Sequence, residues 1–394
     1  LIGNMIVLVC TPYFDPSYGG PSNSVLNLVR FVSQENVDVD LVTTNASNKS
    51  SSNNTELLKW KLQDSYRIQY FPCWNHNDLI VSPSLIQWIS RHVKKYDIVH
   101  TNTIFSPLIS IIHYICRQQN IPYLVTPRGM LDDWALAYKA LKKRVYYSCI
   151  ENHSLAWAKQ IQVLTSPEKD QVNSLGFQET VLVPNGINPQ VFSDLPDAEI
   201  FYQKYPHLRG KILILFLGRI DPKKGLNLLA PAFARAYKSF PNAHLIVAGP
   251  DTINFSSKVR GYFNDAQCLD SVTFTGMLTG KLKYAALAAA NLYIAPSYSE
   301  GFSMSILEGM AAGLPCIITE GCNFPEAKTA NAAYVVKTDT NDIGDALVQC
   351  LQNYKQAQLM GNTAKKFIFQ NYTWHNSSKR LLRAYETILE KSQV

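Results

Sequence analysis

The chain has 394 residues, of which 46% are hydrophobic, and its 37 Lys and Arg exceed its 30 Asp and Glu to give a net charge of +7. This length and hydrophobic content favour two domains of ~100–200 residues, each with its own core. No run of about eighteen apolar residues occurs, which argues against a membrane-spanning helix. The 8 cysteines form no C-x-x-C pair and no zinc-type spacing, so we expect reduced thiols in the cytoplasm.

Short apolar runs alternate with helical patterns along the chain, a sequence typical of β-α-β units and parallel sheets. The first apolar run predicts a strand rather than a signal peptide, because the residues before it lack the basic side chains of a signal peptide. The first half contains the predicted strands Ile6–Cys10, Val39–Thr43, Arg67–Phe71, Ile98–Thr101, Tyr123–Thr126, Ile161–Leu164 and Val181–Val183. The second half contains Ile212–Leu217, His244–Ala248, Val272–Thr275, Leu292–Ala295, Cys316–Thr319 and Tyr334–Val336.

A segment rich in turn-forming residues, Pro184–Pro189, separates the two sets of strands and precedes a polar stretch. We therefore expect an α/β protein with a domain at 1–189 and a second at 190–373, each a doubly wound parallel sheet. The pattern becomes helical beyond residue 340, and residues 374–394 predict a final amphipathic helix.

Glycines follow the first predicted strand at Gly19 and Gly20, directly before a helical pattern. Glycine lets backbone approach a ligand closely, and the first turn of a helix offers free amides to anions. A Gly-Gly turn before any helix looks the same, so a purely structural role stays open. The loop is not G-x-G-x-x-G, which disfavours a nicotinamide site.

His100 and Arg128 each end a predicted strand of the first domain. Side chains at this edge of a parallel sheet are candidates for ligand contact, although a structural role is equally compatible with the pattern. Arg128 could bind an acidic acceptor or a phosphate, or it could brace its loop through Asp132 or Asp133.

In the second domain, the strand Ile212–Leu217 ends in Gly218 and is followed by Arg219 and Lys224 before the next helix. A guanidinium can bind a diphosphate through two parallel hydrogen bonds, and an ammonium adds a compact charge. Together they could neutralise a diphosphate without a metal. Two solvated surface cations are the alternative interpretation.

Glu300 and Glu308 lie eight positions apart, after the predicted strand Leu292–Ala295. Ser303 is a plausible N-cap for the helix that contains Glu308, and the unpaired amides of a helix start attract phosphate. An ordinary amphipathic helix with two solvated glutamates would show the same pattern. The nearby cations at the same sheet edge favour the phosphate-binding interpretation.

The G-R-x-x-x-x-K-G loop and the E-x7-E segment, in this order and spacing, resemble family 4 retaining glycosyltransferases of the GT-B fold. The similarity extends over nearly the whole chain. It implies two Rossmann-like domains facing a cleft, with the C-terminal helix returning to the first domain. The family often has a histidine that touches the donor sugar's hydroxyls near the position of Arg128, and this chain departs from that pattern.

The resemblance also implies roles for individual residues. Arg219 and Lys224 would contact the donor's diphosphate, Glu300 the transferred sugar and Glu308 the ribose. The catalytic set is then Glu300, Arg219, Lys224 and His100. The donor-binding set is Gly19, Gly20, Arg128, Gly218, Met277, Leu278, Gly301, Phe302, Ser303, Met304 and Glu308.

The activity expected from this resemblance is hexose transfer from a nucleoside-diphosphate sugar, such as UDP-glucose, to an acceptor hydroxyl with retention. Similar enzymes of exopolysaccharide and envelope assembly suggest a carbohydrate or a lipid-linked oligosaccharide as acceptor. A sugar-nucleotide epimerase and a non-catalytic sensor or scaffold are the alternatives. Asp38 and Asp40 match the D-x-D of metal-dependent transferases, but they lie in an alternating strand pattern, so we expect no metal and no cofactor.

A basic stretch, Lys139–Arg144, has Trp134, Leu136 and Tyr138 nearby. A basic amphipathic helix of this kind can rest on an anionic membrane, which would place the protein at the inner face of the membrane. A solvated helix face is the alternative. No feature of the sequence indicates nucleic acid as a partner.

Overall fold

The computed structural model describes residues 5–15, 20–46, 56–76, 79–132 and 140–392. The chain divides into two units, Leu1–Asn185 with Trp374–Val394, and Gly186–Thr373. The division falls after Asn185 rather than after residue 189, because Ile187 is buried and its amide donates to the carbonyl of Tyr372 at 2.9 Å. That bond, with the bridge from Ile187 to Thr373, attaches the segment to the second unit.

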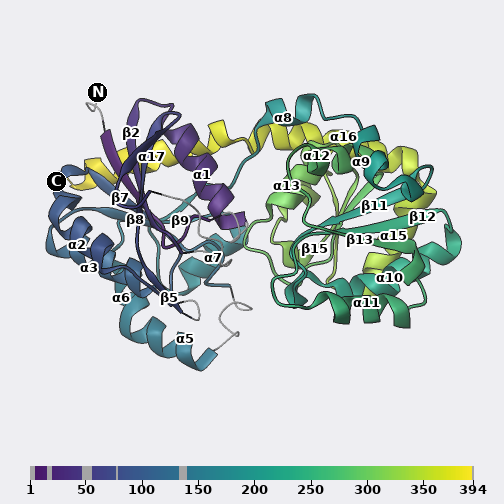
Figure 1. The fold of residues 1–394 in the computed structure, drawn as a ribbon, viewed down its shortest axis with the longest axis horizontal. Helices are drawn as coiled ribbons and strands as arrows, with labels where there is room; N and C mark the ends of the chain where they lie inside the picture. Colours follow the sequence, from purple (N-terminus) through teal and green to yellow (C-terminus); the bar gives the residue numbers. More distant parts are fainter. Residues whose placement is uncertain (1–4, 16–19, 47–55, 77–78, 133–139, 393–394) are drawn as a thin grey trace. The chain divides into compact units, whose positions relative to one another are not determined.

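The first unit is built on a sheet of eight described strands in the order β10-β9-β8-β7-β1-β2-β4-β3 (Figure 1). All neighbouring strands run parallel except β3 and β4, which are antiparallel. The strands are β1 Met5–Cys10, β2 Val37–Thr44, β3 Trp60–Gln63, β4 Tyr66–Phe71, β7 Ile98–Asn102, β8 Tyr123–Thr126, β9 Gln160–Val163 and β10 Thr180–Leu182; the short pair β5 Trp74–His76 and β6 Leu79–Val81 stands apart.

Helices cover both faces of this sheet. Leu8 and Cys10 of β1 pack in one cluster with apolar residues of α2 and α3, whereas Val9 lines a cavity with residues of α1 and α17. The helices are α1 Gly20–Val32, α2 Pro83–His92, α3 Pro107–Gln118, α5 Ala140–Tyr146, α6 Asn152–Trp157, α7 Ser166–Ser174 and α17 Trp374–Ser392, with a 3-10 turn η2 Val93–Lys95 and a π-helical turn η3 Tyr147–Glu151.

The second unit has a wholly parallel sheet of six described strands in the order β13-β12-β11-β14-β15-β16. Its central strand reads ILILFL, a continuous apolar run typical of a strand that is buried on both faces. The strands are β11 Ile212–Leu217, β12 Ala243–Ala248, β13 Val272–Gly276, β14 Leu292–Ala295, β15 Cys316–Thr319 and β16 Tyr334–Val336.

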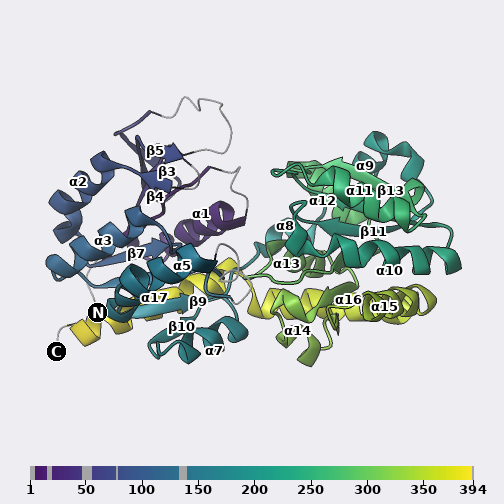
Figure 2. The same ribbon diagram turned by 90° about the horizontal axis from the view of Figure 1, so that it is seen from below.

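Alternate residues of β11 enter two separate cores. Leu213 and Leu215 pack with α12 and α13, whereas Ile214 and Phe216 pack with α10, α11 and α15 (Figures 1 and 2). The helices are α8 Pro189–Ser193, α9 Glu199–Lys204, α10 Leu226–Ser239, α11 Ser256–Asp265, α12 Gly280–Ala289, α13 Met304–Ala311, α14 Glu326–Thr329, α15 Thr340–Gln352 and α16 Tyr354–Asn371, with 3-10 turns η4 Pro206–Leu208, η5 Pro222–Lys224, η6 Leu269–Ser271 and η7 Glu320–Cys322.

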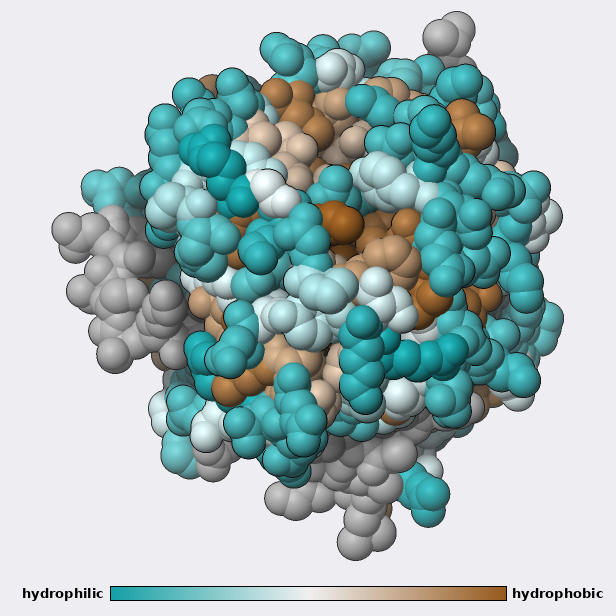
Figure 3. All heavy atoms as spheres, turned by 90° about the vertical axis from the view of Figure 1, so that its right-hand side faces the viewer, coloured by the Kyte–Doolittle hydropathy of each residue, from teal (hydrophilic) through white to brown (hydrophobic). Residues whose placement is uncertain are grey.

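All the strands predicted from the sequence are present, and β3, β5 and β6 were missed. The missed strands are short and mostly exposed, so they carry no continuous apolar run. Within the described residues, none of the helices combines the length and apolar character needed to cross a membrane. On the face of the second unit seen in Figure 3, hydrophobic residues lie scattered among hydrophilic ones.

Candidate functional site

The strands β11 and β14 of the second unit are neighbours in the sheet but not consecutive in the chain. From β11 the chain moves to β12 on one side, and β14 lies on the other side, so the strand order reverses here. Ligands of open parallel sheets bind at such a switch point, outside the carboxyl ends of the strands. The loops that follow β11 and β14 therefore define the first candidate site.

These two loops are held together by backbone contacts. Gly225 adopts a left-handed conformation with φ 69°, and a Cβ on it would lie 1.8 Å from the carbonyl oxygen of Pro296. The amide of Tyr298 donates to the carbonyl of Lys223 at 2.8 Å, and the amide group of Asn227 donates to the Tyr298 hydroxyl at 2.7 Å. The two loops therefore form one structural unit, which fixes the backbone positions of their charged residues.

Lys224 and Glu300 form a buried ion pair between the two loops. Lys224 Nζ lies 2.5 Å from Glu300 Oε1, and their side chains are only 12% and 8% exposed. Ser297 Oγ donates to the same carboxylate oxygen at 2.6 Å. Burial alone would raise the pKa of Glu300, but Lys224, Lys223 and these hydrogen bonds outweigh it and lower the pKa, so the carboxylate is ionised at neutral pH.

Two further cations lie on the β11 loop. Arg219 is exposed, and its guanidinium has no hydrogen-bond or ion-pair partner within the described part of the chain. Burial, with the charges of Lys224 and Arg219, lowers the pKa of Lys223, while Glu300 opposes that change. The loop therefore carries more positive charge than Glu300 balances, as a site for an anion requires.

The start of this loop is shaped by a close backbone approach. Gly218 directly follows β11, and Gly249 lies opposite it with φ 157°. A Cβ on Gly249 would lie 1.7 Å from the carbonyl oxygen of Gly218. Only glycine fits at 249, so this residue, which the sequence analysis did not single out, fixes the path of the backbone into Arg219.

The helix α13 begins next to Glu300, as the sequence predicted. Ser303 is the N-cap residue, but its hydroxyl bonds to that of Ser305 at 3.1 Å instead of capping the helix. Among the described residues, no acceptor contacts the amides of Phe302, Ser303 and Met304. Gly301 joins Glu300 to these amides, and free amides at a helix start attract anions.

Glu308 lies one turn into α13 and pairs with Lys283 of α12, at 2.7 Å between Nζ and Oε1. Burial alone would lower the pKa of Lys283, but Glu308 raises it overall. Lys283 was missed from the sequence, because its partner lies 25 residues away and no local pattern marks the pair. Of the two predicted residues after β13, Met277 is 55% exposed and Leu278 is buried in the core.

In the first unit, His100 is buried with both ring nitrogens engaged. Nδ1 is hydrogen-bonded to the Tyr385 hydroxyl at 2.7 Å and Nε2 to Thr126 Oγ1 at 2.7 Å. Burial, with the nearby charge of Arg128, lowers the pKa of His100 to about 3, so the ring is neutral. This geometry favours the structural alternative for His100, which joins β7 and β8 to α17.

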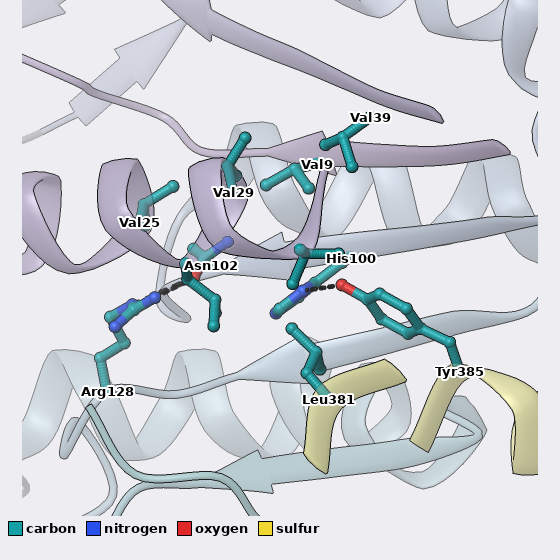
Figure 4. A pocket seen from close by; sticks show the side chains of 11 residues that line it. Val9, Val25, Val29, Val39, His100, Asn102, Arg128, Leu381 and Tyr385 are labelled. Carbon is teal, nitrogen blue, oxygen red and sulfur yellow. Dashed lines mark hydrogen bonds between the residues drawn. The ribbon is translucent and has the colours of Figure 1, made fainter. Parts of the chain in front are cut away.

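Arg128 lies two residues after the end of β8 and has a left-handed backbone, φ 57°. Its Nε and Nη2 both donate to Asn102 Oδ1, at 3.0 and 2.6 Å, so its described hydrogen bonds go to Asn102 (Figure 4). Of the two residues offered for a brace, Asp132 or Asp133, the second lies outside the described residues. Gly20 is the first residue of α1, and Gly19 lies outside the described residues.

Of the two D-x-D carboxylates, Asp40 is engaged in the sheet and Asp38 is exposed. Asp40 is 3% exposed and accepts hydrogen bonds from Arg67, at 2.7 and 2.6 Å, and from the Tyr96 hydroxyl at 2.7 Å. Where the chain is described, no cluster of three or more His, Cys, Asp or Glu side chains is arranged to hold a metal ion. All eight cysteines are free thiols.

Each half of the chain matches a known protein family. Residues 18–191 match the family described as Glycosyltransferase Family 4, and residues 197–367 match Glycosyl transferases group 1. The two matches together extend over most of both units and include the loops after β11 and β14.

Individual relatives are distant. An uncharacterised glycosyltransferase of Methanocaldococcus jannaschii is 24% identical over 322 residues, which cover 76% of this chain and 77% of that protein. The phosphatidyl-myo-inositol mannosyltransferase of Mycobacterium leprae is 29% identical over 55% of this chain and 56% of its own length. The solved structure of Anabaena HepE in complex with UDP and glucose has a TM-score of 0.79 at 13% identity, covering 98% of this chain and 100% of that one.

Proposed function

We propose that this chain, which belongs to glycosyltransferase family 4 and has the GT-B fold, transfers a hexose from a UDP-sugar to an acceptor hydroxyl. The observation that carries the proposal is the Lys224–Glu300 pair between the β11 and β14 loops, flanked by the exposed Arg219 and the free amides of α13. The complex of Anabaena HepE with UDP and glucose supports UDP-glucose as the first donor to test.

In this proposal the diphosphate binds to Arg219 and Lys224 and to the amides that begin α13. These groups act where negative charge develops as the bond to the sugar breaks, and preorganised donors lower the barrier most at that point. Glu300 is ionised and held by Lys224 and Ser297, so it positions the sugar hydroxyls. Glu308, held by Lys283, binds the ribose.

We propose that the reaction proceeds with retention at the anomeric carbon. The leaving diphosphate then accepts the proton of the attacking acceptor hydroxyl, and no protein base is needed. A divalent ion is also unnecessary, because the cations and the helix start supply the positive field. EDTA should therefore leave turnover unchanged, whereas a strict requirement for Mg²⁺ or Mn²⁺ would contradict this part of the proposal.

Product analysis tests the function. The protein is incubated with UDP-glucose and a panel of carbohydrate and lipid-linked oligosaccharide acceptors, and NMR determines the anomeric configuration of the new linkage. A product with the configuration of the donor supports the proposal, and an inverted linkage contradicts it. Isomerisation of the UDP-sugar without acceptor would indicate an epimerase, and tight UDP binding without any product would indicate a sensor or scaffold.

We also propose contact with an anionic membrane through α5 and the turn η3. Val145 and Ile150 are 58% and 40% exposed there, next to the exposed Arg144. The aromatic residues Trp134 and Tyr138 of the predicted basic helix lie outside the described residues. Sedimentation with phosphatidylglycerol vesicles tests this contact: binding that Val145→Glu weakens supports it, and binding unaffected by that change contradicts it.

A further inference from the structure

Arg128 carries a partly buried positive charge that no carboxylate in the described chain neutralises by direct contact. Both of its described hydrogen bonds go to one atom, the amide oxygen of Asn102, which is 1% exposed (Figure 4). Burial lowers the pKa of the guanidinium to about 10, with opposing effects from Tyr13 and Glu168. A buried charge without an ionic partner is costly, so its retention calls for a ligand.

Glu168, a carboxylate whose charge acts on Arg128, is committed to the backbone. Glu168 accepts from the amide of Gly129 at 2.8 Å and from the amide of Leu164 at 2.6 Å. Burial raises the pKa of Glu168 to about 7, although these two hydrogen bonds and Arg128 lower it and Asp132 raises it further. Near neutral pH, Glu168 is therefore only partly ionised, and it holds the loop rather than the guanidinium.

Strained backbone lies at the same sheet edge. Thr103 directly follows Asn102 and has φ 73°, which is unusual for a β-branched residue. Its hydroxyl is buried and has no hydrogen-bond partner among the described residues. Asn102 and Thr126 are opposite each other in the parallel pair β7 and β8, so the strained positions 103 and 128 follow neighbouring strand ends. Strain of this kind persists at sites where a ligand is bound.

The cavity beside Arg128 does not hold that ligand. Its other walls are mainly apolar side chains of β1, β2, α1 and α17, and its volume of ≈ 10 Å³ suits about one water molecule. Figure 4 shows Arg128 and Asn102 at one end of it, away from His100 and Tyr385. The apolar walls desolvate the guanidinium from this side, so we expect a ligand to approach it from outside the cavity.

We propose that Arg128, oriented by Asn102, binds a phosphate group of the acceptor. Guanidinium geometry matches phosphate oxygens through paired N–H donors, and Nη1 has no partner among the described residues. The proposal rests on the proposed function, since it names the acceptor class of that transferase. It replaces the donor contact that the family resemblance implied for Arg128.

Thermal unfolding with inorganic phosphate as the probe tests this site, with saturating UDP present to occupy the donor site. We expect phosphate to raise the melting temperature of the wild type and the apparent Kd for phosphate to rise at least tenfold in Arg128→Met. The matched control is Arg91→Met, which removes an exposed arginine of the same unit. Equal phosphate binding in the wild type and Arg128→Met would overturn the proposal, as would complete loss of phosphate binding once UDP is bound.

Asn102→Asp provides a second, opposite test. An aspartate at 102 would give Arg128 the missing carboxylate within hydrogen-bond distance. We therefore expect a higher melting temperature without phosphate and a loss of phosphate stabilisation. If Asn102→Asp still responds to phosphate as the wild type does, the cation is not the binding group and the proposal fails.

Two further probes distinguish the source of the phosphate. Glucose 6-phosphate represents a soluble phosphorylated sugar, and a polyprenyl phosphate in detergent micelles represents a lipid-linked acceptor. Arg128-dependent binding of either one supports the site and identifies its class. If the protein binds phosphate through Arg128 but does not bind UDP, the proposed function is refuted and this site stands. If it binds UDP but phosphate binding does not depend on Arg128, this site is refuted and the proposed function stands.

Discussion

Glu300 and Lys224 are 76 residues apart in sequence and in direct contact in the structure. The sequence identified each of them, because each follows an apolar strand whose end lies at the edge where ligands bind. Their pairing could not be predicted, since it depends on β11 and β14 being neighbours in the sheet. The same limit explains why Lys283, the partner of Glu308, was missed, and why the contact of Arg128 with Asn102 was not expected.

Glu300→Gln tests the role of this carboxylate. The change removes the charge that pairs with Lys224 and weakens the acceptor of sugar hydroxyls, so we expect the transfer rate to fall by roughly 10²–10³-fold. Glu320→Gln, an exposed carboxylate that follows the adjacent strand β15, is the matched control and should keep the wild-type rate. An unchanged rate in Glu300→Gln would remove Glu300 from the mechanism.

At the scale of elements, the sequence predicted each central strand, because strands buried on both faces are continuous apolar runs. The edge strand β3 and the pair β5 and β6 have exposed residues and gave no such signal. The helix start at Ser303 was also predicted. The sequence did not predict that the Ser303 hydroxyl bonds to Ser305 and leaves the helix without a side-chain cap. Local patterns therefore locate elements better than they assign hydrogen bonds.

Gly249→Ala tests the backbone approach that positions the β11 loop. An added Cβ would meet the carbonyl oxygen of Gly218, so we expect a loss of roughly 2–4 kcal/mol in the free energy of unfolding or a failure to fold. Denaturant unfolding followed by circular dichroism measures the change.

The control for this change is Gly261→Ala, in the middle of α11, where an added Cβ meets nothing within 4 Å. Alanine should stabilise that helix by up to about 1 kcal/mol. Similar unfolding free energies for the two variants would show that the contact at 249 is unimportant.

At the scale of the whole molecule, the sequence predicted two parallel sheets in an α/β chain with the GT-B fold. The turn-rich segment identified the region between the units, but the division falls after Asn185, because the backbone bond from Ile187 to Tyr372 is a long-range contact. The buried glutamates of the first unit, Glu151 and Glu168, were also not expected, since nothing local marks a carboxylate for burial.

These two glutamates predict how stability changes with pH. Burial raises the pKa of each to about 7, against opposing hydrogen bonds, from an ordinary value of 4.5. Because the folded protein favours their protonated forms, the stabilisation is complete below pH 4.5 and is lost as pH rises through 7. We expect each to reduce the free energy of unfolding by on the order of 3 kcal/mol between these limits.

Glu151→Gln should remove part of that pH dependence, because the amide oxygen can still accept from Ser110 and from the amide of Phe105. Urea unfolding at a series of pH values from 5 to 8 measures it. The control is Glu390→Gln, which replaces an exposed glutamate and should keep the wild-type slope of unfolding free energy against pH. A Glu151→Gln variant with that same slope would show that Glu151 does not titrate in this range.

The central claim is that the cationic loop after β11 binds the diphosphate of a nucleotide sugar. Calorimetric titration with UDP tests it most directly, in the wild type, in Arg219→Met and in Arg260→Met, whose arginine lies over the Phe274 ring of the same unit. Arg219 is exposed and without a described partner, so its replacement should not disturb the fold. We predict that UDP binds the wild type and Arg260→Met alike and binds Arg219→Met at least tenfold more weakly; equal affinity in all three, or no binding to the wild type, would contradict the claim.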